Sequence, residues 1–327
     1  MRHRCTALAA SLTLMLGAGC GNLDRIDRVH DLRLLGIRAE PPDQALRIDP
    51  SLGVLGTPQP VQLTALVADP NGGGRPIQYS LAVCAGLDNG RMTPSPSAGA
   101  TFGGAATAQA TYRCRPEGYQ VLAQGTAFAK AGWVEVSATL QASNSLLAAA
   151  LARDDYHGFG GLRLPVQVQI GAGKESVIGT KLVVFTLADP NTYVANQNPQ
   201  LTGIEVGTQP WTAGAPYVFA ASQRPSAKGW NLQPTFDPNL QVPYTQTSYT
   251  GSPLQFTERW RFDYFGTVGT FTPATTGGQQ PISLAPEPAN TNWLPAPGAQ
   301  GPATFWFVVR DGRGGENWLI REARLTP

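Results

Sequence analysis

The chain has 327 residues, of which 42% are hydrophobic and 14% charged, with 24 basic and 22 acidic side chains. This length is sufficient for two domains that each bury a core of their own. The near balance of charge argues against a nucleic-acid-binding protein, because such a protein needs a basic surface to displace the counterions of phosphate.

The first 19 residues have the pattern of an export signal. Two arginines precede an apolar run over residues 7–18, which is shorter than the roughly 20 residues of a membrane-spanning helix. The stretch resembles a bacterial lipoprotein signal that ends at Cys20, although Gly17 occupies the position where such signals prefer leucine. The resemblance implies cleavage before Cys20 and acylation of its thiol and of the new amino terminus. Ordinary secretion with an incidental cysteine is the alternative.

Cleavage changes the charge balance of the mature chain. Without Arg2 and Arg4 the 24 basic residues become 22, which equals the acidic count, so we expect membrane contact through the acyl chains alone. Residues 20–30 then form a lipidated, charged tether between the membrane and the body. Gly21, in place of aspartate after the lipid-bearing cysteine, favours the outer membrane by analogy with other bacteria.

Glycine and proline, with 37 and 28 residues, are spread along the chain between short apolar stretches, as in all-β folds. Alternating apolar residues predict strands at 61–68, 134–140 and 166–170. One helix is predicted, over residues 145–153, with Ser143 or Asn144 as its N-cap.

Four cysteines are present, and Cys5 and Cys20 belong to the export signal and the lipid site. The remaining pair, Cys84 and Cys114, predicts a disulfide in an oxidising compartment. A metal site is the alternative, which the absence of a nearby histidine disfavours. Residues 85–110 are rich in small residues and weakly periodic, so we expect a long loop held at its base by this bridge.

A short internal repeat indicates where the first domain ends. The sequence Leu-Leu-Gly-Ile at 34–37 recurs as Leu-Thr-Gly-Ile at 201–204, and each copy opens a series of alternating strands. Residues 189–199 between the two series contain Pro190 and Pro199, which cannot donate to a sheet ladder. We therefore predict a first domain over residues 31–188, a polar linker over 189–199 and a second domain over 200–327.

Three runs of sequence carry a family resemblance: LRLLGIRAEPP at 32–42, ALVADP at 65–70 and VRDGRGG at 309–315. They resemble a group of predicted, mostly uncharacterised lipoproteins of deltaproteobacteria, especially myxobacteria. The resemblance implies two immunoglobulin-like antiparallel β-sandwiches in tandem, with the short helix in the first, and an envelope location. It brings no catalytic residues with it.

No catalytic motif is recognisable in the mature chain. Its histidines are His30, in the tether, and His157, beside Asp154 and Asp155 after the predicted helix, where a solvated helix end is the simplest interpretation. There is no Gly-x-Ser-x-Gly elbow, no His-Glu-x-x-His pair and no phosphate-binding loop. We therefore predict a non-enzymatic protein without a cofactor or metal; a hydrolase with an unrecognised pair of carboxylates is a less favoured alternative.

Two acidic loops could in principle bind Ca²⁺. The sequences Asp-Pro-Asn-Gly at 69–72 and Asp-Gly-Arg-Gly-Gly-Glu at 311–316 offer oxygen ligands of the kind that Ca²⁺ prefers. The favoured interpretation of both is a turn, in which glycine supplies a positive φ, rather than a Ca²⁺ site.

The tryptophans are the strongest indication of a binding site. Trp211, Trp230 and Trp293 lie in segments rich in proline, glycine and asparagine, and exposed rings there would stack on a sugar or anchor a protein. Core packing at the open ends of the sandwich is the favoured interpretation for all three, and exposure is the alternative. Trp306 faces away from Phe305 and Phe307, so one face of that strand must meet something other than water. The leading hypothesis is a display protein that binds an envelope protein; the second is a module that binds peptidoglycan or another polysaccharide.

Overall fold

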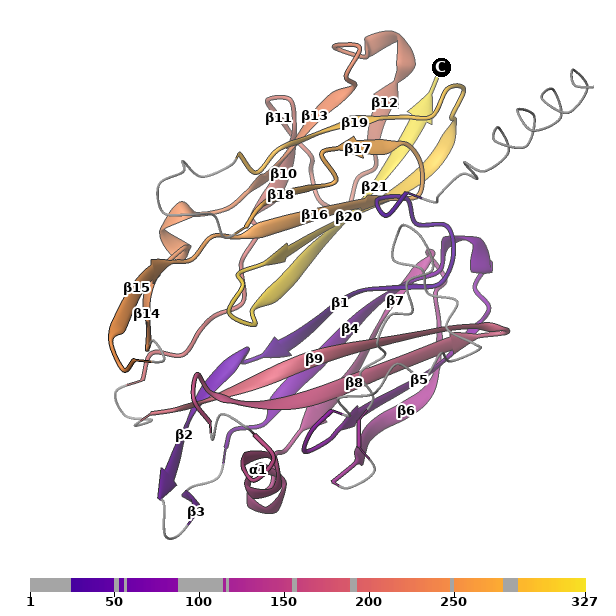
Figure 1. Cartoon of the computed structure of the whole chain (residues 1–327). Helices are drawn as coiled ribbons and strands as arrows, with labels where there is room; N and C mark the ends of the chain where they lie inside the picture. The colour runs from indigo at the N-terminus through magenta and orange to yellow at the C-terminus, as the bar shows by residue number, and fades with distance from the viewer. Residues whose placement is uncertain are drawn as a thin grey trace, which may run out of the picture.

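A computed structural model describes residues 25–49, 53–55, 58–87, 114–115, 118–154, 158–188, 193–247, 250–278 and 288–327. The export signal, Cys20, His157 and most of the loop at 85–110 lie outside the described residues. The fold is all-β, as predicted, and consists of two immunoglobulin-like sandwiches in tandem, with one α-helix among the described residues (Figure 1).

The first sandwich packs a sheet of three strands against a sheet of six. The small sheet has the order β1 (Arg33–Glu40), β4 (Val61–Ala68), β7 (Trp133–Leu140). The large sheet has the order β3 (Gly53–Leu55), β2 (Asp43–Asp49), β9 (Glu175–Leu187), β8 (Leu162–Ala172), β5 (Pro76–Val83), β6 (Gln120–Phe128). Side chains such as Leu63, Val166 and Phe185 from the facing sheets are fully buried and form one apolar core.

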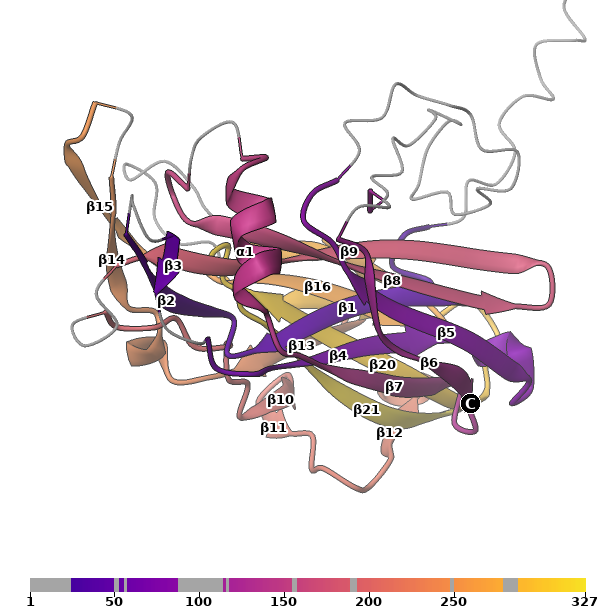
Figure 2. The ribbon, with the colours of Figure 1, turned by 90° about the horizontal axis from the view of Figure 1, so that it is seen from below.

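The helix α1 (Asn144–Leu151) covers part of this sandwich beside β8 (Figure 2). The hydroxyl of Ser143 caps it by accepting a hydrogen bond from the amide of Leu146 at 3.2 Å. Leu147 is fully buried on the side that faces the first core. The predicted helix is thus confirmed, with Ser143 as the cap and an end two residues earlier than expected.

The second sandwich consists of two five-stranded sheets and a protruding hairpin. One sheet has the order β11 (Gln209–Pro210), β10 (Gly203–Val206), β13 (Trp230–Thr235), β19 (Thr291–Leu294), β17 (Thr270–Thr272). The other has the order β12 (Tyr217–Ala220), β21 (Glu316–Thr326), β20 (Gly301–Arg310), β16 (Arg261–Gly266), β18 (Thr275–Gly277). The strands β14 (Pro243–Thr247) and β15 (Pro253–Thr257) pair only with each other. Three 3₁₀ turns complete the described elements: Pro70–Gly72, Ala221–Gln223 and Pro238–Leu240.

The two sandwiches share one topology. The order β1-β4-β7 in the first matches β10-β13-β19 in the second, and β2-β9-β8-β5 matches β12-β21-β20-β16. In both sandwiches the last strand has one parallel neighbour, β2 beside β9 and β12 beside β21, whereas the other strand pairs are antiparallel. The repeated sequence at 34–37 and 201–204 falls on β1 and on the start of β10, so it marks equivalent strands.

The sandwiches stack face to face, which gives four layers of sheet (Figure 1). The layers in contact are the sheet of β1, β4 and β7 and the sheet that contains β16, β20 and β21. Trp306 is fully buried between them beside Leu35 and Leu66, which explains why its strand is apolar on both faces. The guanidinium of Arg310 adds a hydrogen bond across the contact, to the carbonyl oxygen of Leu35 at 2.9 Å.

Residues 25–30 belong to the folded body, which corrects their assignment to a tether. Val29 is fully buried in the contact between the sandwiches, and its amide donates to the carbonyl of Gly266 at 2.9 Å. Asp27 is 2% exposed and accepts a hydrogen bond from the amide of Phe271 at 2.7 Å. The apolar side chain of Val29 and the buried bond of Asp27 fix this segment to the second sandwich before the chain enters the first.

The disulfide between Cys84 and Cys114 is present, as predicted. Cys84 follows β5 directly and is fully buried, and its amide donates to the carbonyl of Pro165 at 3.1 Å. Leu87 and Cys114 form an isolated antiparallel bridge, so the segments on either side of the predicted loop are held next to each other.

Candidate functional site

The three tryptophans expected at a binding surface are buried. Trp211, Trp230 and Trp293 are 3%, 6% and 0% exposed and belong to the aromatic core of the second sandwich. Trp230 and Trp293 are cross-strand partners on β13 and β19, with ring centroids 5.7 Å apart. The interpretation of exposed rings is wrong: Trp230 and Trp293 lie on short strands that direct them into the core, and Trp211 packs there directly after β11. Because all three rings are buried, the hypothesis of a polysaccharide site built on them is rejected.

In both acidic loops, the aspartate carboxylate accepts hydrogen bonds from other groups of the protein. Asp69 accepts two hydrogen bonds from the guanidinium of Arg75, at 2.8 and 2.9 Å. Asp311 accepts from the amides of Arg313 and Gly315 at 2.7 and 2.9 Å, which closes the turn between β20 and β21. Within the described ranges, no group of three or more His, Cys, Asp or Glu side chains is arranged to hold a metal ion.

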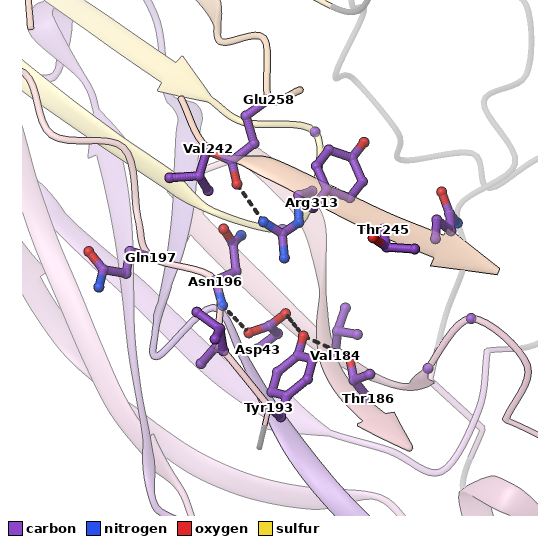
Figure 3. A pocket seen from close by; sticks show the side chains of 18 of the residues that line it. Asp43, Val184, Thr186, Tyr193, Asn196, Gln197, Val242, Thr245, Glu258 and Arg313 are labelled. Atoms are coloured by element: carbon purple, nitrogen blue, oxygen red, sulfur yellow. Dashed lines mark hydrogen bonds and ion pairs between the residues drawn. The ribbon is translucent and has the colours of Figure 1, made fainter. Parts of the chain in front are cut away.

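A large cleft lies between the two sandwiches at one end of the molecule. Its volume is about 1440 Å³. The first sandwich lines it with residues 158–161, Arg163 and the C-terminal half of β9. The second lines it with Leu240, residues 242–246 and the turn between β20 and β21. Residues 193–200, which run from one sandwich to the other, form its floor (Figure 3). The cleft therefore depends on both sandwiches and on the segment that joins them.

The floor of the cleft is held by a buried hydrogen-bond network around Asp43. Its carboxylate accepts from the hydroxyl of Tyr193 at 2.6 Å and from the amide of Asn196 at 2.7 Å (Figure 3). The side chain of Asn196 in turn donates to Asp311 at 2.7 Å, which connects the two sandwiches. Burial is the main cause that raises the pKa of Tyr193, and the hydrogen bond to Asp43 raises it further. The hydroxyl of Tyr193 therefore stays protonated and donates. The hydrogen bonds of Asn196 thus fix the position of this part of the predicted polar linker.

A second cluster stands opposite, at the base of the β14–β15 hairpin. Arg313 donates to the carboxylate of Glu258 at 2.6 Å, and its guanidinium lies over the ring of Tyr244, 4.5 Å from the centroid. Burial raises the pKa of Glu258, and the hydrogen bond from Arg313 opposes this shift. The two carboxylates of the cleft, Asp43 and Glu258, are each occupied by donors of the protein. Both clusters therefore fix the walls in place.

Apart from the exposed Arg163, the exposed side chains of the remaining lining are neutral. Four large apolar side chains, each at least 37% exposed, face the cleft: Leu182, Leu187, Val194 and Val242. Five exposed polar side chains line it as well: Gln197, Gln200, Thr245, Gln246 and Gln255. Amide groups both donate and accept hydrogen bonds, so this surface suits a ligand that offers both kinds of partner without charge.

The cleft lies at the opposite end of the strands from residues 25–30. Glu258 and Trp260, just before β16, line the cleft, whereas Gly266 at the other end of β16 binds Asp27 and Val29. Six residues of extended strand separate Trp260 from Gly266, which corresponds to about 20 Å. Figure 1 shows the same arrangement, with the β14–β15 hairpin at the left and the segment that precedes β1 at the right.

The comparisons with known proteins show no family. No family model matches the chain, and no curated protein is similar to it. Among solved structures, it is similar to Escherichia coli alpha-2-macroglobulin activated by porcine elastase, with 10% identity over 92% of this chain and 22% of that chain and a TM-score of 0.24. The latent dimeric PorU of Porphyromonas gingivalis gives 12% identity over 91% of this chain and 24% of that chain, with a TM-score of 0.21.

The native conformation of the E. coli macroglobulin gives 12% identity over 88% of this chain and 17% of that chain, with a TM-score of 0.20. The chain thus spans about a quarter or less of the length of the structures it matches. Similarity at this level carries no argument about function.

Sequence reasoning missed the cleft. Its lining comes from segments that are far apart in the chain, and each contributes only a few residues. The one local signal is the density of amide side chains at 196–200, where Asn196, Gln197, Asn198 and Gln200 follow one another closely. We interpreted that stretch as a linker.

Proposed function

We propose that this protein is a non-catalytic lipoprotein of the bacterial cell envelope, and that it presents the cleft between its two sandwiches to a partner. The acyl chains on Cys20 hold it to the outer membrane, and the stacked sandwiches keep the cleft in a fixed shape. The observation that carries this proposal is the position of the cleft, at the end of the body remote from residues 25–30.

Chain length supports this orientation. Arg25, the first described residue, lies five positions after Cys20, and five residue steps of extended chain span at most roughly 18 Å. An anchor at Cys20 therefore keeps the end of the body that contains Asp27 and Val29 near the bilayer, and the cleft faces away from it. Within the described residues, no helix has the length and apolar character to cross a membrane.

The contacts of the acidic groups support a binding role. Asp43 is held by Tyr193 and Asn196, and Glu258 by Arg313, so both carboxylates of the cleft contribute to the walls. His30 belongs to the opposite end of the body, where its carbonyl accepts from the amide of Asn71 at 3.0 Å. A nucleophile with an adjacent base is the arrangement that covalent catalysis requires, and these contacts favour display instead.

Two measurements test the anchor and the orientation. Wild type should sediment with the outer-membrane fraction and Cys20→Ser should be released; a Cys20→Ser protein that stays with the membrane contradicts the anchor. For orientation, a fluorophore is attached at Ile26→Cys or at Gln246→Cys, two exposed positions at opposite ends. In phosphatidylcholine vesicles with a headgroup quencher, the label at 26 should be quenched and the label at 246 should not. Equal quenching of both contradicts the orientation.

A further inference from the structure

The strand β14 borders the cleft with its edge. Five consecutive residues, 242–246, line the cleft. Side chains alternate between the two faces of a strand, so a strand that presents one face to a cavity contributes every second residue. A continuous run of lining residues means that the edge of β14 adjoins the cavity. β14 pairs with β15 alone, so this edge has no partner strand in the described sheets.

The hydrogen-bond pattern of the hairpin determines which backbone groups face that edge. The amide of Glu258 donates to the carbonyl of Val242 at 3.0 Å, so Val242 and Glu258 form a hydrogen-bonded pair. Such pairs alternate with non-hydrogen-bonded pairs along an antiparallel ladder. Thr245, opposite Gln255, falls in a non-hydrogen-bonded pair, and its N–H and C=O therefore point away from β15 and toward the cleft.

The prolines of the hairpin agree with this assignment. Pro243 is paired with Thr257, and Pro253 with Thr247, which are both non-hydrogen-bonded positions by the same alternation. Proline lacks the N–H that would point outward there, so it is tolerated at an edge. Thr245 lies between these positions and keeps an outward N–H on β14.

The formal charges that line the cleft sum to zero. The charged lining residues are two acids, Asp43 and Glu258, and two bases, Arg163 and Arg313. The carboxylate of Asp43 accepts hydrogen bonds from Tyr193 and Asn196, and Glu258 is paired with Arg313. Arg163 donates to the carbonyl of Gly160 at 3.4 Å. With no net charge, and with amide, hydroxyl and apolar side chains over most of the lining, the cleft matches the backbone and the apolar side chains of an uncharged peptide.

Two observations favour a peptide over a sugar or a small molecule. The ring of Tyr244 is in contact with Arg313 and is stacked with Phe256 at 5.4 Å between centroids, and Trp260 is 3% exposed. Sugar recognition uses exposed aromatic faces, and these rings are already engaged. The volume of about 1440 Å³ also exceeds the roughly 300–1,000 Å³ of pockets for small ligands.

We propose that the cleft binds an extended, uncharged peptide segment of another protein, which pairs with the free edge of β14 as a third strand. The N–H and C=O of Thr245 bond to its backbone. The apolar side chains of Leu182, Val194 and Val242 contact its alternate side chains. This proposal rests on the display function above and specifies its partner.

The test uses the full-length protein in mild detergent. A phage-displayed library of random twelve-residue peptides is selected on it, and the affinities of enriched peptides are measured by fluorescence anisotropy. We expect peptides without net charge and with apolar residues at alternate positions. Methylation of single backbone nitrogens in an enriched peptide should weaken binding at every second position only, which is the signature of strand pairing.

Three variants locate the site. Thr245→Pro removes the N–H at the cleft edge and should weaken binding roughly tenfold or more. Thr245→Val keeps the N–H and should bind within about twofold of wild type. Thr257→Pro is the matched control, because it places a proline at an exposed, non-hydrogen-bonded position of β15 that does not line the cleft. Circular dichroism melting of both proline variants verifies that each is folded.

Several outcomes overturn the proposal. These are a selection without enrichment, equal binding by wild type and Thr245→Pro, or enrichment of charged peptides. Binding of muropeptides or chitohexaose in the absence of any enriched peptide also overturns it. The outcomes separate this proposal from the display function: an anchored protein that enriches no peptide contradicts the peptide alone, whereas a peptide-binding protein that does not depend on Cys20 for membrane attachment contradicts the anchor alone.

Discussion

The side-chain oxygen of Asn198 accepts a hydrogen bond from the backbone amide of Glu316 at 2.8 Å. Its amide nitrogen donates in the other direction, to the carbonyl of Ala39 at 2.7 Å and to the carboxylate of Glu40 at 2.6 Å. One buried side chain thus joins the end of β1 in the first sandwich to the start of β21 in the second. This contact is one of those that hold the two sandwiches together beside the cleft.

Replacement of Asn198 by alanine should destabilise the protein. Asn198→Ala leaves the amide of Glu316 and the carbonyl of Ala39 without their buried partner, which costs about 2–4 kcal/mol in the free energy of unfolding. Urea denaturation measures the change. Gln197→Ala is the control, because Gln197 is exposed, and it should stay within about 0.5 kcal/mol of wild type. Equal stability of the two variants would contradict the role of Asn198.

Removal of the disulfide should have an effect of similar size. Cys84 and Cys114 are 30 residues apart, and the chain-entropy relation gives about 3–4 kcal/mol for a loop of that length. The double variant Cys84→Ala/Cys114→Ala should unfold at correspondingly lower urea. Non-reducing peptide mapping of wild type should show the two cysteines linked, and two alkylatable thiols would refute the pairing.

The segment before β1 should contribute to stability although it precedes both sandwiches. Asp27→Ala removes the buried acceptor of the Phe271 amide, so we expect a loss of about 1–3 kcal/mol. Asp27→Asn keeps one oxygen as an acceptor and should lose less. Asp31 is exposed and serves as the control position. If Asp27→Ala and Asp31→Ala have the same stability, residues 25–30 are not held as described.

Acid should weaken one surface ion pair of the first sandwich. The hydrogen bond from Arg75 to Glu175, 2.7 Å long, lowers the pKa of Glu175 below its ordinary value of 4.5. A lowered folded-state pKa stabilises the protein above pH 4.5, and this stability is lost as the pH falls through the folded-state value. Because Glu175 is 42% exposed, the contribution is below about 1 kcal/mol.

Urea midpoints at pH 7 and pH 3.5 measure this effect. Glu175→Gln should be slightly less stable than wild type at pH 7 and should lose less stability on acidification. An equal acid loss in the two proteins would show that another group is responsible.

Strand periodicity predicted individual strands well, because one face of each strand packs in the core of its own sandwich. The strand predicted at 61–68 has the bounds of β4. Alternation of this kind is typical of a strand with one face in water, but Leu66 and Ala68 on its second face are buried against the second sandwich. The pattern of Trp306 did indicate such a contact, since that residue is apolar on the face opposite its neighbours. Sequence alone did not identify which sheet would cover which.

The buried tryptophans show where composition misleads. Trp230 follows Gly229, and Trp293 lies between asparagine and leucine in a proline-rich segment, so their surroundings resemble loops. Both lie on strands of four to six residues, too short for alternation to be recognised. The cleft was not predictable for a different reason: its walls are brought together only by the contact between the sandwiches.

The position of Asp27 has a consequence for assembly in an exported chain. Its partner, the amide of Phe271, is synthesised 244 residues later. A polypeptide that crosses a membrane amino terminus first delivers its leading residues long before their docking place exists. In the lipoprotein proposed above, residues 25–30 would therefore dock only after the second sandwich has folded, and acylation of Cys20 would precede completion of the body that it anchors.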